Sequence, residues 1–206
     1  MLQSYLRDAA WRYILDQGIC ALPVQPTRII KASGWCLYTY SQFAKKTGYT
    51  VPDIISKFNP EAFVFWSQRV QNYVICYNAS YPVDVIRWSL MHEIAHIVLG
   101  HISADVPTLT RVRAPQRSIF EVEAQGFARR VLCPSIVLHA CRAIEPVQIM
   151  QLCGISRTAA EYRSTHMHEL EIRNRWRIHP LERAVEHQFR IFILKYFLML
   201  YLDETA

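Results

Sequence analysis

Apolar residues follow two different spacings along the chain. Three short runs rich in aromatic and β-branched residues, at 35–40, 62–66 and 73–77, indicate strands. The last two runs are separated by a polar stretch and could pair as a hairpin. Most other segments carry apolar residues at helical spacing, beginning with 1–18. This order predicts an α+β fold, in which a small sheet of about three strands in the N-terminal half packs on a helical core and the C-terminal half is mostly helical.

One predicted helix is unusual because polar residues interrupt an apolar run. It begins near Asp84, which is suited to cap a helix N-terminus, and ends at Leu99 before a glycine. It contains the sequence MHEIAHIVLGH at 91–101. Burying histidine and glutamate there costs about several kcal/mol unless they are paired or bound to a metal. These polar residues therefore need a chemical explanation.

The HExxH pattern inside this helix has a geometric basis for binding zinc. His92 and His96 are four residues apart, so both lie on one helical face and can direct a ring nitrogen at the same metal. Glu93 lies about 100° around the helix from His92, within reach of a metal-bound water. Zinc lowers the pKa of that water, and the glutamate can accept its proton. The pattern predicts His92 and His96 as zinc ligands and Glu93 as the general base.

A third protein ligand is expected from a later helix, SIFEVEAQGFARRVLCP, at 118–134. His101 does not stand at the metzincin spacing HExxHxxGxxH, and we interpret it as a residue of the helix C-terminus, where the helix dipole favours histidine. In the later helix, Ser118 and Glu121 have the spacing of a capping box, which gives Glu121 a structural role. Glu123 adjoins the apolar side of that helix and has no such role. Glu123 is therefore the predicted third ligand, with Glu121 as the competing candidate.

Together the two segments resemble the ImmA/IrrE family of metallopeptidases, whose pattern is approximately HElgHxxLgH followed by ExEANxFAxxLLxP. The matching residues are His92, Glu93, His96, Leu99, Gly100, His101, Glu121, Glu123, Ala124, Phe127, Ala128, Leu132 and Pro134. Ala95, Gln125 and residues 131–133 depart from the pattern without removing a predicted ligand or base. The resemblance covers roughly residues 20–165.

This resemblance implies a gluzincin-like zinc endopeptidase with a zincin-like helical core, in which Zn²⁺ is the cofactor. It also implies that the substrate is a helix-turn-helix transcriptional repressor, often encoded nearby. Cleavage of that repressor would derepress a phage or other mobile element, or stress genes.

Composition and charge limit the classes of protein to which this chain can belong. The net charge of +6 is mildly basic and does not by itself indicate nucleic-acid binding. No N-terminal segment has the form of a signal peptide, and the longest apolar run, 191–202, falls short of the roughly 20 residues of a membrane span. The six cysteines form no CxxC pair and are expected to be reduced thiols. We therefore expect a cytoplasmic protein with no transmembrane span.

The chain is predicted to comprise a peptidase domain at 1–165 and a helical C-terminal extension at 166–206, whose role the sequence does not indicate. Residues 147–163 read as helix, glycine-containing turn and helix, with Arg157 and Arg163 on the second helix. This supports an alternative function, a DNA-binding regulator with a structural or sensory zinc site. The simpler interpretation is a helical hairpin that completes the peptidase core.

The sequence leaves several features of the predicted site open. Candidates for an oxyanion-stabilising group are His139, His166, His168 and Tyr77. The strand at 73–77 is predicted to bind an extended substrate by strand addition. The identity of the substrate, its cleavage site, the activating signal and the oligomeric state do not follow from the sequence.

Overall fold

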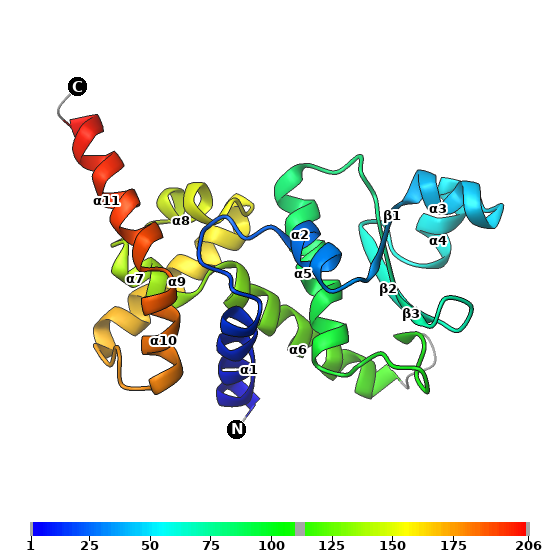
Figure 1. Cartoon of the computed structure of the whole chain (residues 1–206), viewed down its shortest axis with the longest axis horizontal. Coiled ribbons are helices and arrows are strands. Elements are labelled where there is room, and N and C mark those ends of the chain that lie inside the picture. Colours follow the sequence, from blue (N-terminus) through cyan, green and yellow to red (C-terminus); the bar gives the residue numbers. More distant parts are fainter. Residues whose placement is uncertain (1, 110–113, 205–206) are drawn as a thin grey trace. The chain divides into compact units, whose positions relative to one another are not determined.

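The computed structural model describes residues 2–109 and 114–204 (Figure 1). By its internal contacts the chain divides into two compact units, which are described separately. Unit 1 combines the N-terminal segment Met1–Val24 with Arg129–Ala206, and unit 2 is the continuous segment Gln25–Ala128. Helices predominate and the strands of the described residues lie in the N-terminal half, so the predicted α+β fold is confirmed.

The sheet belongs to unit 2 and has the strand order β1-β3-β2. Its strands are β1 (Cys36–Thr39), β2 (Ala62–Ser67) and β3 (Asn72–Tyr77). β2 and β3 pair antiparallel as the predicted hairpin, and β1 pairs parallel to β3. β3 is therefore the central strand, with a neighbour along each edge. The prediction that this strand binds substrate by strand addition is wrong, because strand addition needs a free edge.

The helices of unit 2 surround this sheet. They are α2 (Pro26–Ala32), α3 (Tyr40–Thr47), α4 (Val51–Lys57), α5 (Val83–Val98) and the larger part of α6 (Ala114–Leu132). Tyr40 and Phe43 of α3 pack with Ile54 of α4 against the sheet residues Phe63 and Val74. Capping boxes at Thr39 and Thr50 define where α3 and α4 begin.

Helix α5 contacts α2, β2 and β3 and carries the HExxH motif. Leu90, Met91 and Ile94 are completely buried, so this helix is part of the core, as its apolar run predicts. Its N-cap residue is Pro82, and Asp84, the predicted cap, lies instead in the first turn. A carboxylate in that turn still interacts favourably with the helix dipole.

Among the described residues of unit 1, the secondary-structure elements are all helices. Unit 1 contains α1 (Leu2–Asp16), α7 (Ser135–Ala140), α8 (Pro146–Cys153), α9 (Arg157–Arg173), α10 (Pro180–Gln188), α11 (Arg190–Glu204) and the end of α6. The side-chain amide of Gln188 donates to the carbonyls of Ile14 and Ile19, which ties α10 to the N-terminal segment. The predicted domain limit at residue 165 falls inside α9, and the functional division at that residue stays a prediction. Within the described residues, no helix is both long and apolar enough to span a membrane.

The helix-turn-helix predicted at 147–163 corresponds to α8 and α9. Gly154 ends α8 at a φ of 59°, and the Ser156 hydroxyl accepts from the Ala159 N–H to cap α9. Arg163 is only 2% exposed and donates to the Cys133 carbonyl and the Ser135 hydroxyl. It is therefore a core residue, and the interpretation of Arg163 as part of a DNA-contacting surface is wrong.

Candidate metal centre

Two histidines of α5 and one glutamate of α6 converge in unit 2. His92 Nε2 lies 3.0 Å from Glu121 Oε2 and 3.1 Å from His96 Nε2. The third pair, His96 Nε2 and Glu121 Oε2, is separated by 3.8 Å. These three atoms form a group able to hold a metal ion, since all lie within 4.8 Å of one another. The structure thus brings together the two predicted histidine ligands with Glu121.

The distances and the donor types fit zinc. Two ligand atoms of a tetrahedral zinc site, each at about 2.0–2.1 Å, lie about 3.3 Å apart, close to the spacing of the two histidine nitrogens. Two imidazoles and one carboxylate also form a donor set typical of catalytic zinc, which retains a further position for water. His92, His96 and Glu121 could therefore hold Zn²⁺ without rearrangement of their helices.

The electrostatics of the cluster favour a positive charge between its members. The hydrogen bond from His92, with His96 close by, holds the pKa of the Glu121 carboxyl far below its usual range. Burial lowers the pKa of His92, but the hydrogen bond to Glu121 and the nearby carboxylates outweigh burial, so the pKa of His92 is raised. Both directions mean that an anionic carboxylate and a cation are stable together at this point.

The predicted base, Glu93, lies beside this cluster and is 8% exposed. Burial raises the pKa of its carboxyl, and His92 and His96 partly oppose that effect. The carboxylate also accepts a hydrogen bond from the backbone N–H of Val64 on β2. A carboxylate with a raised pKa is a better proton acceptor near neutral pH. The sheet therefore fixes Glu93 in place, and its burial makes it more basic.

A pocket of about 280 Å³ opens beside these groups. Its lining residues are Asn59, Pro60, Glu61, Ala62, Trp88, Ser89, His92, Glu93, Glu121 and Gln125. The Ser89 hydroxyl donates to Glu61 at 2.6 Å, which connects α5 to the segment that leads into β2. His92, Glu93 and Glu121 thus share one concave surface, as a reaction with a bound substrate requires.

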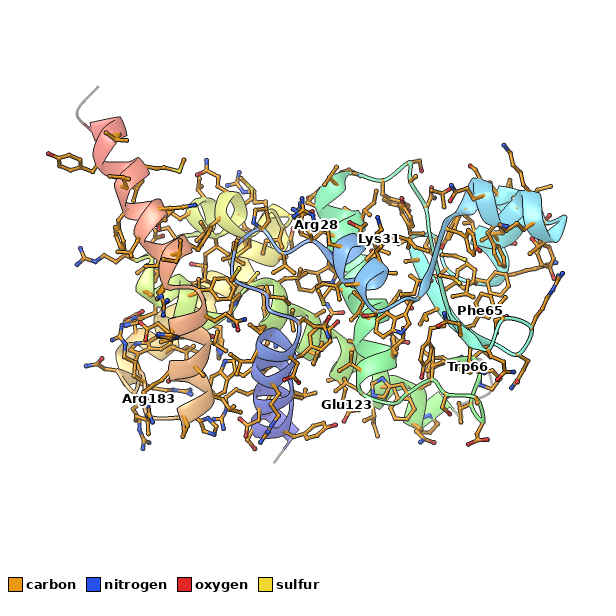
Figure 2. The ribbon with its side chains drawn as sticks, viewed as in Figure 1. Arg28, Lys31, Phe65, Trp66, Glu123 and Arg183 are labelled. Carbon is orange, nitrogen blue, oxygen red and sulfur yellow. The ribbon has the colours of Figure 1, made fainter. Side chains whose placement is uncertain are left out.

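The outer edge of β2 is already occupied next to this pocket. The N–H of Ala62 donates to the Asn59 side chain at 3.3 Å, and the N–H of Trp66 donates to the Pro107 carbonyl at 2.9 Å. Between them, the N–H of Val64 holds Glu93. Figure 2 labels Phe65 and Trp66 on this strand. These three N–H groups are therefore already bonded within the protein, one of them to Glu93, the predicted base.

The structure does not bring Glu123, the predicted third ligand, to the two histidines of the HExxH motif. Glu123 also lies on α6, where Figure 2 labels it, but its Oε2 is 3.0 Å from His101 Nε2. Positions two apart on an α-helix point about 200° away from each other, so Glu121 and Glu123 cannot both face His92.

The expectation for Glu121 depended on where its helix begins. Helix α6 already includes Ala114, so Ser118 lies within the helix and its hydroxyl donates to the Ala114 carbonyl. The predicted capping box with Glu121 is therefore wrong, and the Glu121 carboxylate is available to the histidines. Pro115 was the available sequence signal, because proline is favoured in the first turn of a helix.

His101, which the sequence pattern assigned only to the helix end, lies against His96. Its Nδ1 lies 3.0 Å from His96 Nδ1, and its ring stacks on Phe120 with centroids 4.1 Å apart. Gly100, at a φ of 74°, turns the chain so that the His101 N–H donates to the His96 carbonyl. Burial lowers the pKa of His101 to about 4, and His96 adds to this effect, so His101 is neutral at pH 7.

Three of the candidates for an oxyanion-stabilising group have carboxylate partners within unit 1. His139 Nδ1 lies 2.6 Å from Glu171, and the ring of His139 stacks on Trp176. His166 lies 3.6 Å from Glu169, and His168 lies 3.7 Å from Glu145. The fourth candidate, Tyr77, is the last residue of β3 in unit 2.

Comparison with known families agrees with this geometry. Residues 51–165, more than half of the chain, match the model of the M78 peptidase family, which is described as the IrrE N-terminal-like domain. The matched segment contains the whole cluster from His92 to Glu123. No curated protein matches the chain.

Proposed function

Since the chain belongs to the M78 peptidase family, with an IrrE N-terminal-like domain, we propose that it is a zinc-dependent endopeptidase. The observation that carries this proposal is the convergence of His92, His96 and Glu121 near the buried carboxylate of Glu93, at a pocket that His92, Glu93 and Glu121 line. Family membership supports a metallopeptidase-type function, and the cluster supplies the donors that such a function needs. Glu121 is the proposed third ligand, in place of the Glu123 expected from the sequence.

Each residue of the cluster has a defined part in this proposal. His92, His96 and Glu121 would hold zinc, which when bound supplies a Lewis acid and lowers the pKa of water. Glu93 accepts the proton of the attacking water and can deliver it to the departing amine nitrogen of the peptide. The Val64 N–H keeps the Glu93 carboxylate oriented while its protonation state changes.

The proposed substrate is a helix-turn-helix transcriptional repressor, cleaved at a specific site in the cytoplasm so that mobile-element or stress genes are derepressed. The ImmA/IrrE resemblance of both motif segments supports this assignment. The alternative, a DNA-binding regulator with a structural zinc, loses support because Arg163 is buried.

The test combines metal content with cleavage. Purified wild type, Glu93→Gln, Glu121→Gln and Glu123→Gln chains are loaded with zinc, dialysed and measured by elemental analysis. Each is then incubated with a helix-turn-helix repressor encoded in the same gene neighbourhood, and the fragments are identified by mass spectrometry. We expect about one zinc in the wild type and in Glu93→Gln, cleavage reduced by about 10²-fold or more in Glu93→Gln, and zinc lost in Glu121→Gln.

The zinc measurement can also contradict the proposal. A wild-type chain that takes up no zinc after loading would contradict the peptidase proposal. DNA binding that weakens steeply with salt in that same chain would favour the regulator instead.

A further inference from the structure

We propose that Glu123, His101 and His96 form a one-directional chain of hydrogen bonds that fixes the tautomer of His96. Glu123 and His101 are then positioning residues for metal binding. The inference rests on the proposed function in one respect, that His96 Nε2 is the atom that faces the metal.

The direction of the chain follows from the donors and acceptors available. An ionised carboxylate only accepts hydrogen bonds, so at the 3.0 Å contact with Glu123 the proton belongs to His101 Nε2. A neutral imidazole protonated at Nε2 has a lone pair at Nδ1. At the second 3.0 Å contact, His101 Nδ1 therefore accepts and His96 Nδ1 donates. This leaves a lone pair on His96 Nε2, the atom that points at His92 and Glu121.

Packing holds this chain in one arrangement. His96 is 1% exposed and His101 is 3% exposed, so water has little access to compete for either ring. The His101 ring lies nearly parallel to the Phe120 ring, with an interplanar angle of 8°, which fixes the plane of its two nitrogens. The backbone bond from the His101 N–H to the His96 carbonyl keeps the two residues in register.

The consequence for metal binding is preorganisation. A ligating histidine whose second nitrogen donates to an acceptor is held in the required tautomer and orientation, and the lone pair on its ligating nitrogen becomes more basic. Loss of such a partner typically lowers metal affinity by about 10- to 100-fold. In this series of hydrogen bonds, two imidazole rings separate the carboxylate that sets the tautomer, Glu123, from the metal-facing atom, His96 Nε2. Glu121 and Glu123, two residues apart on α6, therefore have different tasks.

Two other roles for Glu123 make different predictions. A purely structural contact between α6 and His101 would affect stability without changing the tautomer of His96. A direct metal ligand, as the sequence analysis expected, would remove zinc from the chain when substituted. Zinc affinity, zinc stoichiometry and the tautomer of His96 together separate these roles.

The first measurement is zinc affinity of the full-length chain by competition with a chelator. Glu123→Leu removes the terminal acceptor, and His101→Phe keeps the stacking on Phe120 while removing both ring nitrogens. We expect both variants to bind zinc about 10- to 100-fold more weakly than wild type, with about one zinc per chain at saturation. Glu123→Gln retains an acceptor oxygen, and His101→Asn places one near the Nδ1 position, so each should recover part of the loss.

The matched control is Glu171→Leu, which breaks a carboxylate–histidine pair in unit 1 that is outside the metal cluster. Its zinc affinity should remain within about threefold of wild type. An equal loss of affinity in this control would overturn the proposal, because any disrupted ion pair would then have the same effect.

The second measurement reads the tautomer directly in metal-free protein, by long-range ¹H–¹⁵N correlation spectra of chains labelled at histidine. In the wild type, His96 should be protonated at Nδ1. In Glu123→Leu and His101→Phe the Nε2-protonated form of His96 should appear, while Glu171→Leu should match the wild type. Circular dichroism on the same samples identifies any variant that does not fold. If one of Glu123→Leu and His101→Phe fails to fold, the His96 tautomer in the other variant decides the test.

Two results would overturn the inference. One is an unchanged His96 tautomer with unchanged zinc affinity in the folded variants. The other is zinc lost in Glu123→Gln but retained in Glu121→Gln, which would make Glu123 a ligand. Failure of the proposed peptidase function is a separate outcome, because the tautomer is read without zinc and without substrate.

Discussion

Each unit of this protein buries ionisable side chains, and the two clusters differ in how their polar atoms are paired. In unit 1, Arg163 is a donor surrounded by acceptors, the Cys133 carbonyl and the Ser135 hydroxyl. In unit 2, two imidazole nitrogens and a carboxylate oxygen face the same point, and all three can act as acceptors. In the first cluster a guanidinium nitrogen faces acceptors, although the buried Arg163 Nε has no hydrogen-bond partner, whereas in the second cluster acceptors face one another.

This difference shows what kind of burial indicates a site. A buried charge with complementary partners connects structural elements, as Arg163 does between α9 and the segment after α6. Acceptors that converge on one point can bind a cation, and two of these residues, His92 and Glu121, also line a pocket with the predicted base Glu93. Each cluster contains a buried ionisable residue, Arg163 in one and His96 in the other, so the nature of the facing atoms is what separates a structural group from a candidate metal site.

The largest expected effect on stability comes from Arg163→Ala in unit 1. The substitution leaves the buried Cys133 carbonyl and the partly buried Ser135 hydroxyl without their donor and opens a cavity, so the free energy of unfolding should fall by about 3 kcal/mol. Arg157→Ala on the same helix is the matched control, because Arg157 is an exposed member of an ion pair with Glu161 and should contribute less than about 1 kcal/mol. Urea denaturation measures both. Zinc stoichiometry should stay unchanged, and zinc lost from folded Arg163→Ala would contradict the separation of the two clusters.

A slightly smaller effect is expected from the metal itself. Zinc at 100 times its dissociation constant should raise the free energy of unfolding by about 2.7 kcal/mol if it binds only the folded chain. Thermal unfolding with zinc and with a chelator measures this difference. The stabilisation should disappear in His92→Ala and persist in Glu171→Leu, which breaks an ion pair outside the cluster. A zinc-dependent shift that survives His92→Ala would place the metal elsewhere.

Local sequence patterns predicted much of this arrangement. The apolar run of α5, with histidines four residues apart, determines that His92 and His96 share a face, and no distant part of the chain is needed for that inference. The β2–β3 hairpin could be predicted for the same reason, because its strands are adjacent in sequence. The central position of β3 could not, since it depends on β1, which pairs with β3 from more than thirty residues away.

The sequence did not predict that Glu121, and not Glu123, lies beside His92, and the physical reason is a different one. The prediction depended on which residue begins α6. Because this helix includes residues about one turn before Ser118, that serine lies inside the helix and is not its N-cap. The role of His101 was also hidden, because it depends on a left-handed turn at Gly100 that folds the chain back on His96. Helix boundaries and turn geometry, which local periodicity defines poorly, thus decided the details of the site.

Two glycines give the smallest predicted effect and the finest comparison between a structural and a site-building position. Gly48 ends α3 and Gly100 follows α5, with φ of 77° and 74°, and no heavy atom lies within 4 Å of an added Cβ at either position. Each glycine-to-alanine substitution should therefore destabilise the chain by about 1 kcal/mol through backbone strain alone. Only Gly100 positions His101, so zinc affinity measured by chelator competition should fall in Gly100→Ala and stay at the wild-type value in Gly48→Ala. Equal zinc affinities in these two variants, at equal loss of stability, would mean that the turn after α5 is not needed to place His101 against His96.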